Sequence, residues 1–346
     1  MSHRPRTSGP VTSRILRLGT RGSPLALFQA RAVASLLQQH ADVACETVII
    51  RTSGDRLADA PLSEIGGKRL FVKEIEDALL SGDIDLAVHS SKDMPAVLPE
   101  GLDIGAVLVR EDARDAIVLP RTLQGPRRGG EGSLDVPMSA DDVVARLGPT
   151  PRIGTSSVRR SAQLVRLFPG GSFLPIRGNL DTRLRKVDAG DFDAIVLAAA
   201  GLRRLEQGHR ISAMLPVEAC VPAPGQGVIA IEIRNGDIDV RNVVATIDDR
   251  PSRVALDAER EVVTRLGGGC QMPIGAYATV SGDGLEITAI VVSLDGARAV
   301  RADARGPAAE ARDVGAAAAK QLLERGAGAI LAEAARTQAP ADGVRS

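Results

Sequence analysis

The first part of the chain alternates between short apolar runs and longer stretches with apolar residues at helical spacing. One predicted helix opens at Pro24 behind a possible Ser23 cap, where the N–H that proline lacks costs nothing, and another covers 70–80. Apolar runs typical of buried strands lie at 15–20, 47–51 and 84–88. Strands that alternate with helices favour a mainly parallel sheet with helices on both faces.

The same rhythm returns further along the chain. A strand is predicted at 152–154, a helix at 158–168 behind Ser156 and Ser157, and a strand at 194–198. The segment GTRGS that leads to Gln29 resembles the segment GTSS that leads to Gln163. Two related strand–turn–helix openings predict two similar α/β lobes that face one cleft. A further strand at 228–233, after PGQG, is expected to cross back to the first lobe.

Two regions depart from this rhythm. Residues 121–150 cluster Gly, Pro and Arg in QGPRRGGEG, which is typical of a long surface insertion. From about Ser252 the pattern predicts a small α+β domain with a helix at 254–266, three strands and one long Ala-rich helix. These strands are expected at 276–280, 285–292 and 298–304.

The predicted fold is therefore α/β, with two lobes around a cleft and a small C-terminal α+β domain. Its expected parts are a polar tail at 1–14, a first domain at 15–110 with 226–245, a second domain at 111–222, and a third domain at 250–346.

Composition excludes several classes of function. Among 346 residues, 43 Lys and Arg balance 43 Asp and Glu, so no overall charge attracts nucleic acid or an anionic membrane. Aromatic residues make up 2%, too few for the stacking platforms of single-stranded nucleic-acid binding. The 3 cysteines and 4 histidines show no zinc spacing, and no apolar segment suits a signal peptide or a membrane span. A cytoplasmic protein without a metal is expected.

Arginine recurs at the predicted strand-to-helix turns, where backbone N–H groups already favour anions. A single Arg is more often a solvated surface charge, but repetition in a neutral chain favours a cleft that binds carboxylates through planar guanidinium groups. The arginines at or near these turns are Arg21, Arg159, Arg160, Arg177, Arg183, Arg203 and Arg204.

Two further residues could carry chemistry. Asp93 follows the strand that ends near His89, at the edge where open α/β sheets hold ligands, and it could stabilise a cationic centre; equally, it could be a turn residue before Pro95. Neighbouring Lys92 should favour the ionised carboxylate. Cys270 lies on a Gly-rich turn, which makes a thiol accessible, although a lone Cys is inert by default.

The order of eight segments resembles the porphobilinogen deaminase family, from about Ile15 to the last helix. These segments are RLGTRGSPLALFQA, GGKRLFVKEIEDALL, DLAVHSSKDMP, IGTSSVRRSAQL, IRGNLDTRL, DAIVLAAAGLRRL, PAPGQG and GGGCQMPIGAYA. The resemblance implies a monomer of three domains, of which the first two resemble periplasmic binding proteins. It also implies a dipyrromethane cofactor joined to Cys270 by a thioether link.

The implied reaction joins four porphobilinogen molecules, each with loss of ammonia, and releases hydroxymethylbilane. Each porphobilinogen carries an acetate and a propionate, which accounts for the arginines. Asp93 would stabilise positive charge on pyrrole nitrogens, and Gln226 would lie on the hinge between lobes. The resemblance assigns cofactor contacts to Cys270, Lys92, Ser90, Ser157, Arg159, Arg160, Asp93 and Arg183, and substrate contacts to Arg21, Arg177, Arg183, Arg204, Lys68 and Phe71.

Departures and alternatives remain. Glu64 and Arg69 differ from the residues usual in the family, in a loop expected over the cleft, and the 121–150 insertion is longer than usual. A binding module that kept the cleft but lost the chemistry would lack the Cys or the Asp, and both are present. A cysteine hydrolase that uses Cys270 would need a His partner in the same domain, and none is evident.

Overall fold

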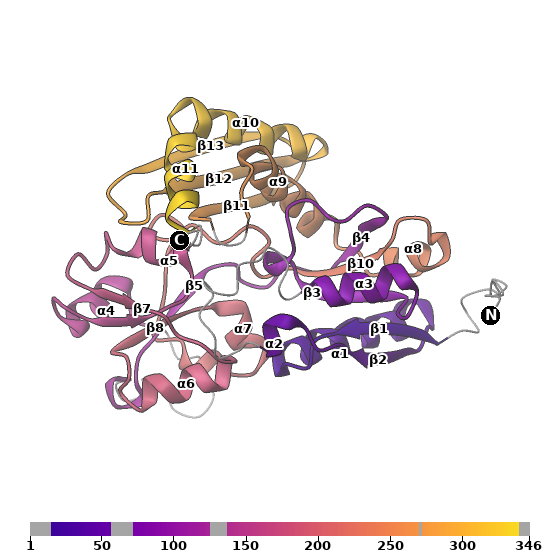
Figure 1. Ribbon diagram of the computed structural model, residues 1–346, viewed down its shortest axis with the longest axis horizontal. Helices are drawn as coiled ribbons and strands as arrows, with labels where there is room; N and C mark the ends of the chain where they lie inside the picture. Colours follow the sequence, from indigo (N-terminus) through magenta and orange to yellow (C-terminus); the bar gives the residue numbers. More distant parts are fainter. Residues whose placement is uncertain (1–14, 57–71, 125–136, 270–271, 339–346) are drawn as a thin grey trace, which may run out of the picture.

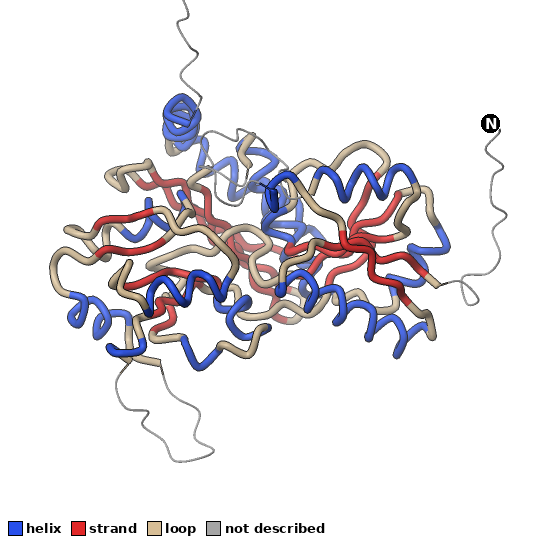
Figure 2. The backbone as a smooth tube through the Cα atoms, turned by 60° about the horizontal axis from the view of Figure 1, so that its bottom comes forward, coloured by secondary structure: helices blue, strands red, loops and turns tan. Residues whose placement is uncertain are grey.

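The computed structural model describes residues 15–56, 72–124, 137–269 and 272–338. Within them the strands form three sheets of five, five and three strands. Figure 1 shows the resulting arrangement, with one lobe at the right, the second at the left and the third domain above both. Figure 2 shows the sheets of both lobes flanked by helices.

Lobe 1 is built on the sheet β2-β1-β3-β10-β4, in which β1, β2 and β3 are parallel and β10 is antiparallel to both neighbours. Its strands are β1 (Leu16–Thr20), β2 (Cys45–Ile49), β3 (Leu86–Ser90), β4 (Leu102–Val107) and β10 (Ile229–Arg234). Its helices are α1 (Pro24–Ala41), α2 (Ser53–Arg56), α3 (Lys73–Ser81), the 3₁₀ turn η2 (Ser91–Asp93) and α8 (Ile238–Ala245). The Ser23 side chain accepts a hydrogen bond from the Ala26 N–H, so the predicted cap of α1 is confirmed.

Lobe 2 repeats the plan with the sheet β7-β6-β8-β5-β9, in which β5 is the antiparallel strand. Its strands are β5 (Asp115–Val118), β6 (Arg152–Gly154), β7 (Ser172–Leu174), β8 (Ala194–Ala198) and β9 (Ala213–Met214). Its helices are α4 (Ala140–Leu147), α5 (Val158–Leu164), α6 (Leu180–Asp188), α7 (Ala199–Arg204) and the 3₁₀ turns η3 (Arg121–Leu123) and η4 (Gly208–Arg210).

The resemblance between the GTRGS and GTSS segments corresponds to equivalent positions in the two lobes. β1 and β6 each lie between two parallel neighbours, and each leads into a serine-capped helix, α1 or α5. The chain crosses between lobes twice, from β4 to β5 and from β9 to β10, so each lobe receives its antiparallel strand after a crossing. These two crossings form the hinge, and the predicted return of the later strand to lobe 1 is confirmed.

The third domain packs helices on one face of an antiparallel sheet β11-β12-β13. Its elements are α9 (Arg250–Leu266), β11 (Ile274–Ser281), β12 (Gly284–Val292), β13 (Ala299–Pro307), the 3₁₀ turn η5 (Ala308–Glu310), α10 (Ala311–Glu324) and α11 (Ala327–Gln338). Asp249 caps α9 by accepting from the Ser252 N–H, and Gly267 ends it at a φ of 65° in the left-handed region. The predicted class, two α/β lobes with a small α+β domain, is confirmed.

Two expectations need correction. Residues 121–150 are not one irregular insertion, because η3 and α4 lie inside this range and Val143 of α4 is fully buried in the core of lobe 2. A capping box at Ser139 and Asp142 starts that helix. The single long Ala-rich helix is two helices, because Gly326 takes a φ of 94°, which an α-helix cannot contain.

The remaining predicted strands and helices lie where expected, with smaller shifts at their ends. The second strand, predicted at 47–51, is β2 at Cys45–Ile49, and the helix predicted to reach residue 168 ends as α5 at Leu164. None of the helices in the described ranges is long and apolar enough to cross a membrane.

Candidate functional site

A cavity of about 70 Å³ lies where the two lobes and the third domain meet. Its polar lining comes from Ser91 and Lys92 of lobe 1, Ser157 and Arg159 of lobe 2, and Arg260 of the third domain. Gly269, which directly precedes Cys270 in the sequence, also lines it. A larger open depression of about 550 Å³ at the outer end of lobe 1 contains none of the predicted site residues. The three-domain cavity is therefore the candidate site.

The segment that bears Asp93 leaves lobe 1 at the carboxyl end of a buried strand. β3 is buried up to His89, whose Nε2 lies 3.0 Å from Oε2 of buried Glu232 on β10. The chain then turns through η2, closed by a hydrogen bond from the Met94 N–H to the Ser91 carbonyl at 3.1 Å. Asp93 is exposed at the end of this turn. The strand end thus presents a carboxylate to the space between the lobes, as open α/β sheets present ligand-binding groups.

Lys92 connects this turn to the hinge. Its ammonium lies 3.4 Å from Oε1 of Gln226, and burial, reinforced by the positive charge of Arg160, lowers its pKa to about 8. The carboxylates of Asp93 and Asp115 oppose that shift without cancelling it. Burial of this ammonium has a cost in free energy, and an anionic ligand beside it would reduce that cost.

Gln226 joins both crossings at the hinge. Its side-chain amide donates to the Ala113 carbonyl at 2.6 Å and to Oδ1 of Asp115 at 2.9 Å, both on the first crossing side. Because the same residue lies beside Lys92, the hinge, the Asp93 turn and the edge of lobe 2 form one hydrogen-bonded unit. The hinge position that the family resemblance implied for Gln226 agrees with this geometry.

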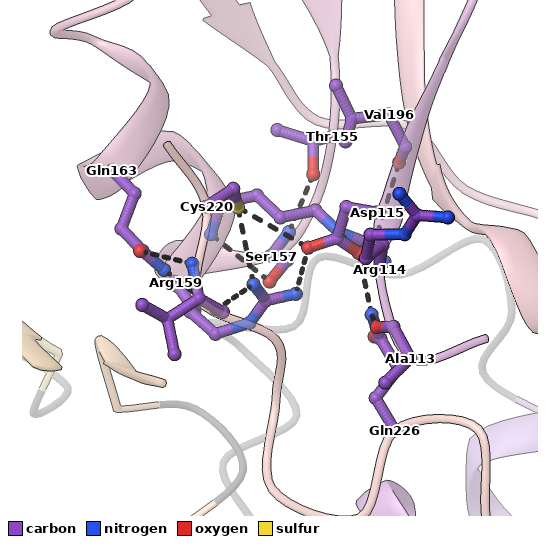
Figure 3. Close-up of polar contacts among 12 residues, drawn as sticks. Ala113, Arg114, Asp115, Thr155, Ser157, Arg159, Gln163, Val196, Cys220 and Gln226 are labelled. Carbon is purple, nitrogen blue, oxygen red and sulfur yellow. Dashed lines mark hydrogen bonds and ion pairs between the residues drawn. The ribbon is translucent and has the colours of Figure 1, made fainter. Parts of the chain in front are cut away.

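Asp115 organises the base of lobe 2 (Figure 3). Its fully buried carboxylate forms ion pairs with Arg159 and Arg160, each at 2.7 Å, and accepts from the Cys220 thiol at 3.3 Å. Burial alone would raise the pKa of this carboxyl, but the two guanidinium groups outweigh burial and hold its pKa far below the ordinary range. Asp115 is therefore a buried anion that pairs with two buried cations and leaves these three groups with a net positive charge.

Arg159 and Arg160 consequently differ from the surface groups that an Arg-lined cleft suggests. They are 4% and 6% exposed, and Arg159 also donates to the Val221 carbonyl while Arg160 donates to the Val196 carbonyl. Sequence reasoning missed their partner Asp115. The available signal was a charged residue that directly opens the apolar run of residues 116–119.

Three other predicted arginines lie nearby with less compensation. Burial and the like charges of Arg160 and Arg177 lower the pKa of Arg183 to about 10, while Asp93 alone opposes them. Among the described residues, Arg177 makes no hydrogen bond or ion pair. Arg204 donates to the Gly227 carbonyl at 2.6 Å on the hinge, and burial lowers its pKa to about 10. The geometry therefore groups Arg160, Arg177 and Arg183 on one side of the cleft.

The other predicted residues are placed as follows. Arg21 directly follows β1 and is half-buried. Ser90 exchanges hydrogen bonds with buried Gln29, whose amide donates to the Ser90 hydroxyl at 2.8 Å. Ser157 caps α5 and accepts from the Arg160 N–H. Lys68, Phe71, Cys270, Glu64 and Arg69 lie outside the described residues or in the gaps between them.

The thiols that the structure does describe are poor nucleophiles. Burial raises the pKa of Cys45 to about 11 and that of Cys220 to about 12, and Asp115 adds to the shift at Cys220. Both thiols remain protonated near neutral pH, whereas thioether formation needs a thiolate. Neither of them is suited to carry a covalent group.

The lining of the cavity fits a carboxylate-bearing cofactor next to Gly269. Ser91 is 3% exposed, and within the described part of the chain its Oγ has no hydrogen-bond partner. Buried hydroxyls normally have a partner, so an unpartnered one in a cavity with Lys92 and Arg260 is suited to a bound anion. A dipyrromethane, which carries carboxylate side chains, has the matching chemistry.

Comparison with known proteins identifies the family. Residues 16–242 match the family described as porphobilinogen deaminase, dipyromethane cofactor binding domain, and residues 254–324 match the porphobilinogen deaminase C-terminal domain. The chain is 45% identical over 324 residues to a porphobilinogen deaminase of Syntrophobacter fumaroxidans, covering 93% of this chain and 99% of the relative. It is 46% identical over 319 residues to that of Bordetella parapertussis, covering 92% and 96%.

Among solved structures, the VFT2 periplasmic domain of Bordetella pertussis BvgS aligns with a TM-score of 0.36 and 18% identity, over 67% of this chain and 86% of that one. An ancestral cationic amino acid solute binding protein aligns with a TM-score of 0.40 and 16% identity, over 72% and 96%. The two family domains together span both lobes and most of the third domain, and the sequence identity extends over nearly the whole chain. By these matches the chain belongs to the porphobilinogen deaminase family, and its first two domains are the part that binds the dipyrromethane cofactor.

Proposed function

We propose that this chain is a transferase that condenses four porphobilinogen molecules head to tail into hydroxymethylbilane for tetrapyrrole biosynthesis, releasing ammonia at each step. The observation that carries the proposal is the exposed carboxylate of Asp93 on lobe 1, whose charge acts on the Arg183 guanidinium of lobe 2 beside the like charges of Arg160 and Arg177. A carboxylate for a developing cation and guanidiniums for carboxylates are the two requirements of this substrate.

Binding falls to the cations of lobe 2 and the hinge. Arg177, Arg183 and Arg204 would hold the acetate and propionate groups of porphobilinogen, with Arg21 at the lobe 1 side. The depressed pKa values of Arg183 and Arg204 support this role, because an anion would relieve the burial cost of each charge. Lys68 and Phe71 are proposed contacts on the resemblance alone.

The chemical step falls to Asp93. When porphobilinogen loses ammonia, an azafulvene cation forms, and the free α-carbon of a pyrrole attacks its methylene carbon. The new C–C bond leaves a protonated ring that loses the α-proton to restore the pyrrole. The exposed Asp93 carboxylate would stabilise positive charge on both ring nitrogens.

The dipyrromethane cofactor, attached to Cys270 by a thioether bond, would supply the first accepting pyrrole. Lys92, Ser157, Arg159, Arg160, Arg183 and Ser90 would position its side chains. Cys270 follows the Gly267–Gly269 turn, and the two described thiols are too basic to compete. We further propose domain bounds of 15–110 with 226–245, 111–222 and 250–346, and a cytoplasmic monomer.

The attachment is tested by intact mass. Wild-type protein should be heavier than its sequence by two linked pyrrole units, and Cys270→Ala should lack that excess because no other thiol is suited to the link. A Cys45→Ala variant is the matched control and should keep the added mass. An unmodified wild type, or added mass that persists in Cys270→Ala, would contradict the attachment.

The division between chemistry and binding is tested by comparing Asp93→Asn with Arg177→Ala. Asn keeps the shape of Asp but not its charge, so turnover should fall roughly 10²–10³-fold with little change in KM. Arg177→Ala should instead raise KM and let partly elongated protein accumulate, because one carboxylate loses its partner. Mass spectrometry of single turnovers resolves these species. Near-normal elongation by Asp93→Asn would leave Asp93 as a turn residue only.

A further inference from the structure

Ser91 has a buried hydroxyl group to which neither the fold nor the proposed chemistry assigns a role. Its backbone is fixed, since the Ser91 N–H donates to the Val228 carbonyl at 3.0 Å and its carbonyl accepts from the Met94 N–H at 3.1 Å. Its side chain is 3% exposed, faces Gly225 of the hinge and lines the three-domain cavity. In the described ranges its Oγ has no hydrogen-bond partner. Such an arrangement destabilises a fold unless something else binds the hydroxyl.

The neighbouring serine is in a different position. Ser90 is the residue that the family resemblance names, yet its hydroxyl already exchanges hydrogen bonds with Gln29 at 2.8 and 3.2 Å. Ser91 turns to the other side of the chain, toward the third domain, because strand residues alternate and η2 begins there. Of these two hydroxyls, the one at Ser91 remains available to a ligand in the cavity.

The cavity favours an anion. Its charged lining residues are Lys92, Arg159 and Arg260, and no carboxylate is among the described residues that line it. Asp115 neutralises Arg159 from behind, but the Lys92 pKa stays depressed by burial and by Arg160. An anionic group beside Lys92 would therefore be stabilised by charge, and a neutral donor such as Ser91 would complete its hydrogen bonds.

The lining of the cavity identifies the kind of group. It combines the Ser91 hydroxyl with the ammonium of Lys92 and the guanidinium of Arg260, and these donors suit a carboxylate. Gly269 lines the same cavity and directly precedes Cys270 in the sequence. A cofactor attached to Cys270 is therefore a better candidate for this cavity than a substrate that enters the cleft. We propose that the Ser91 hydroxyl donates a hydrogen bond to a carboxylate side chain of the dipyrromethane cofactor, beside the Lys92 ammonium.

This inference rests on the proposed function. Its test asks whether the effect of one substitution on Tm changes sign between protein with the cofactor and protein without it. Ser91→Ala is made in the wild-type background, which carries the cofactor, and in Cys270→Ala, which cannot attach it. Without cofactor, removal of an unpartnered buried hydroxyl should leave Tm unchanged or raise it. With cofactor, the same change should lower Tm by on the order of 2 °C, because a hydrogen bond to an ionised group is lost.

Ser212→Ala provides the matched control. Ser212 is also buried, at 6% exposure, but it lies in lobe 2 away from the cavity, and its hydroxyl accepts from the Leu119 N–H at 3.0 Å. Loss of that bond should lower Tm equally in both backgrounds. Ser91→Cys, which keeps nearly the same volume and only a weak donor, repeats the measurement should the alanine variant express poorly.

Each outcome decides the question. A lower Tm in both backgrounds would give Ser91 a role in the fold, for example through an ordered water, and an unchanged or higher Tm in both would give it none; either result overturns the proposal. Intact mass separates this proposal from the proposed function. Added mass on the wild type without a change of sign refutes the Ser91 contact alone, whereas absence of added mass refutes the cofactor attachment on which both depend.

Discussion

Replacement of Asp115 by Asn should destabilise the protein more than any single surface change. The carboxylate is fully buried and pairs with two guanidiniums that are 4% and 6% exposed, so neither Arg159 nor Arg160 can turn to solvent. Removal of one partner from a buried ion pair costs about 3–5 kcal/mol, because the charge left behind stays desolvated. Against a typical net stability of about 5–15 kcal/mol, that loss is large.

The matched control lies in the same lobe. Asp193 pairs with Arg152 at 3.0 Å, but their side chains are 37% and 48% exposed, so Asp193→Asn should cost less than about 1 kcal/mol. Urea denaturation followed by far-ultraviolet circular dichroism is the suitable assay, because the chain has no Trp and 1 Tyr. A loss at Asp115 no greater than the loss at Asp193 would refute the assignment of a buried, charge-balancing role.

Acid provides a second measurement for the same residue. The native pKa of Asp115 lies below its ordinary value of 3.8, so the unfolded chain binds the proton more readily than the native one. The stabilisation by Asp115 is therefore complete above about pH 4 and is lost as pH falls toward the native pKa. Asn does not titrate, so the stability difference between wild type and Asp115→Asn should shrink on acidification below that value. A constant difference would contradict the pairing.

Three further predictions concern the domain junction, the active turn and the insertion. Arg110, at the hinge, forms an ion pair at 2.6 Å with buried Glu259 of the third domain. Arg110→Met should therefore lower the free energy of unfolding, measured in urea, by about 3–5 kcal/mol, and a loss below about 1 kcal/mol would contradict a stabilising role for this pair. Lys92 loses its positive charge above its pKa of about 8, so the rate at which apo-protein attaches the cofactor, measured by intact mass, should fall as pH rises through that value. Lys92→Gln should attach the cofactor slowly at every pH, and an identical pH profile in both proteins would exclude a role for Lys92 in cofactor binding. Replacement of residues 125–136 by a short Gly-Ser linker should leave the enzyme soluble and active. Both flanking segments are hydrogen-bonded to Ser212, and the entropy cost of closing a loop depends weakly on its length. Inactive or insoluble protein would show that the segment is needed.

The sequence alone determined much of the architecture, for local reasons. Apolar runs of strand length, the serine at residue 23 and the proline at residue 24 reflect backbone hydrogen bonding and capping, which act within a few residues. The repeated GT turn correctly predicted two related lobes. The motifs also identified the family, since their order along the chain needs no structure to be recognised.

Errors arose where the decisive contacts were distant in sequence. The Gly-rich segment within 121–150 led to the whole range being predicted as irregular, although a helix follows that segment and buries Val143 in the core of lobe 2. Local composition does not reveal which residues a tertiary core will bury. In the Ala-rich C-terminal segment, helix propensity is high on both sides of Gly326, and only the packing of α11 back onto the sheet requires the break.

The electrostatics of the site were decided by tertiary structure. The sequence favoured Arg159 and Arg160 as ligands for carboxylates, yet in the fold both pair with Asp115, more than forty residues away. The depressed pKa of Lys92 and the unpartnered hydroxyl of Ser91 likewise arise from burial between three domains. Sequence position specifies which charges a chain carries, but their effect depends on desolvation and on neighbours that only folding brings within a few ångströms.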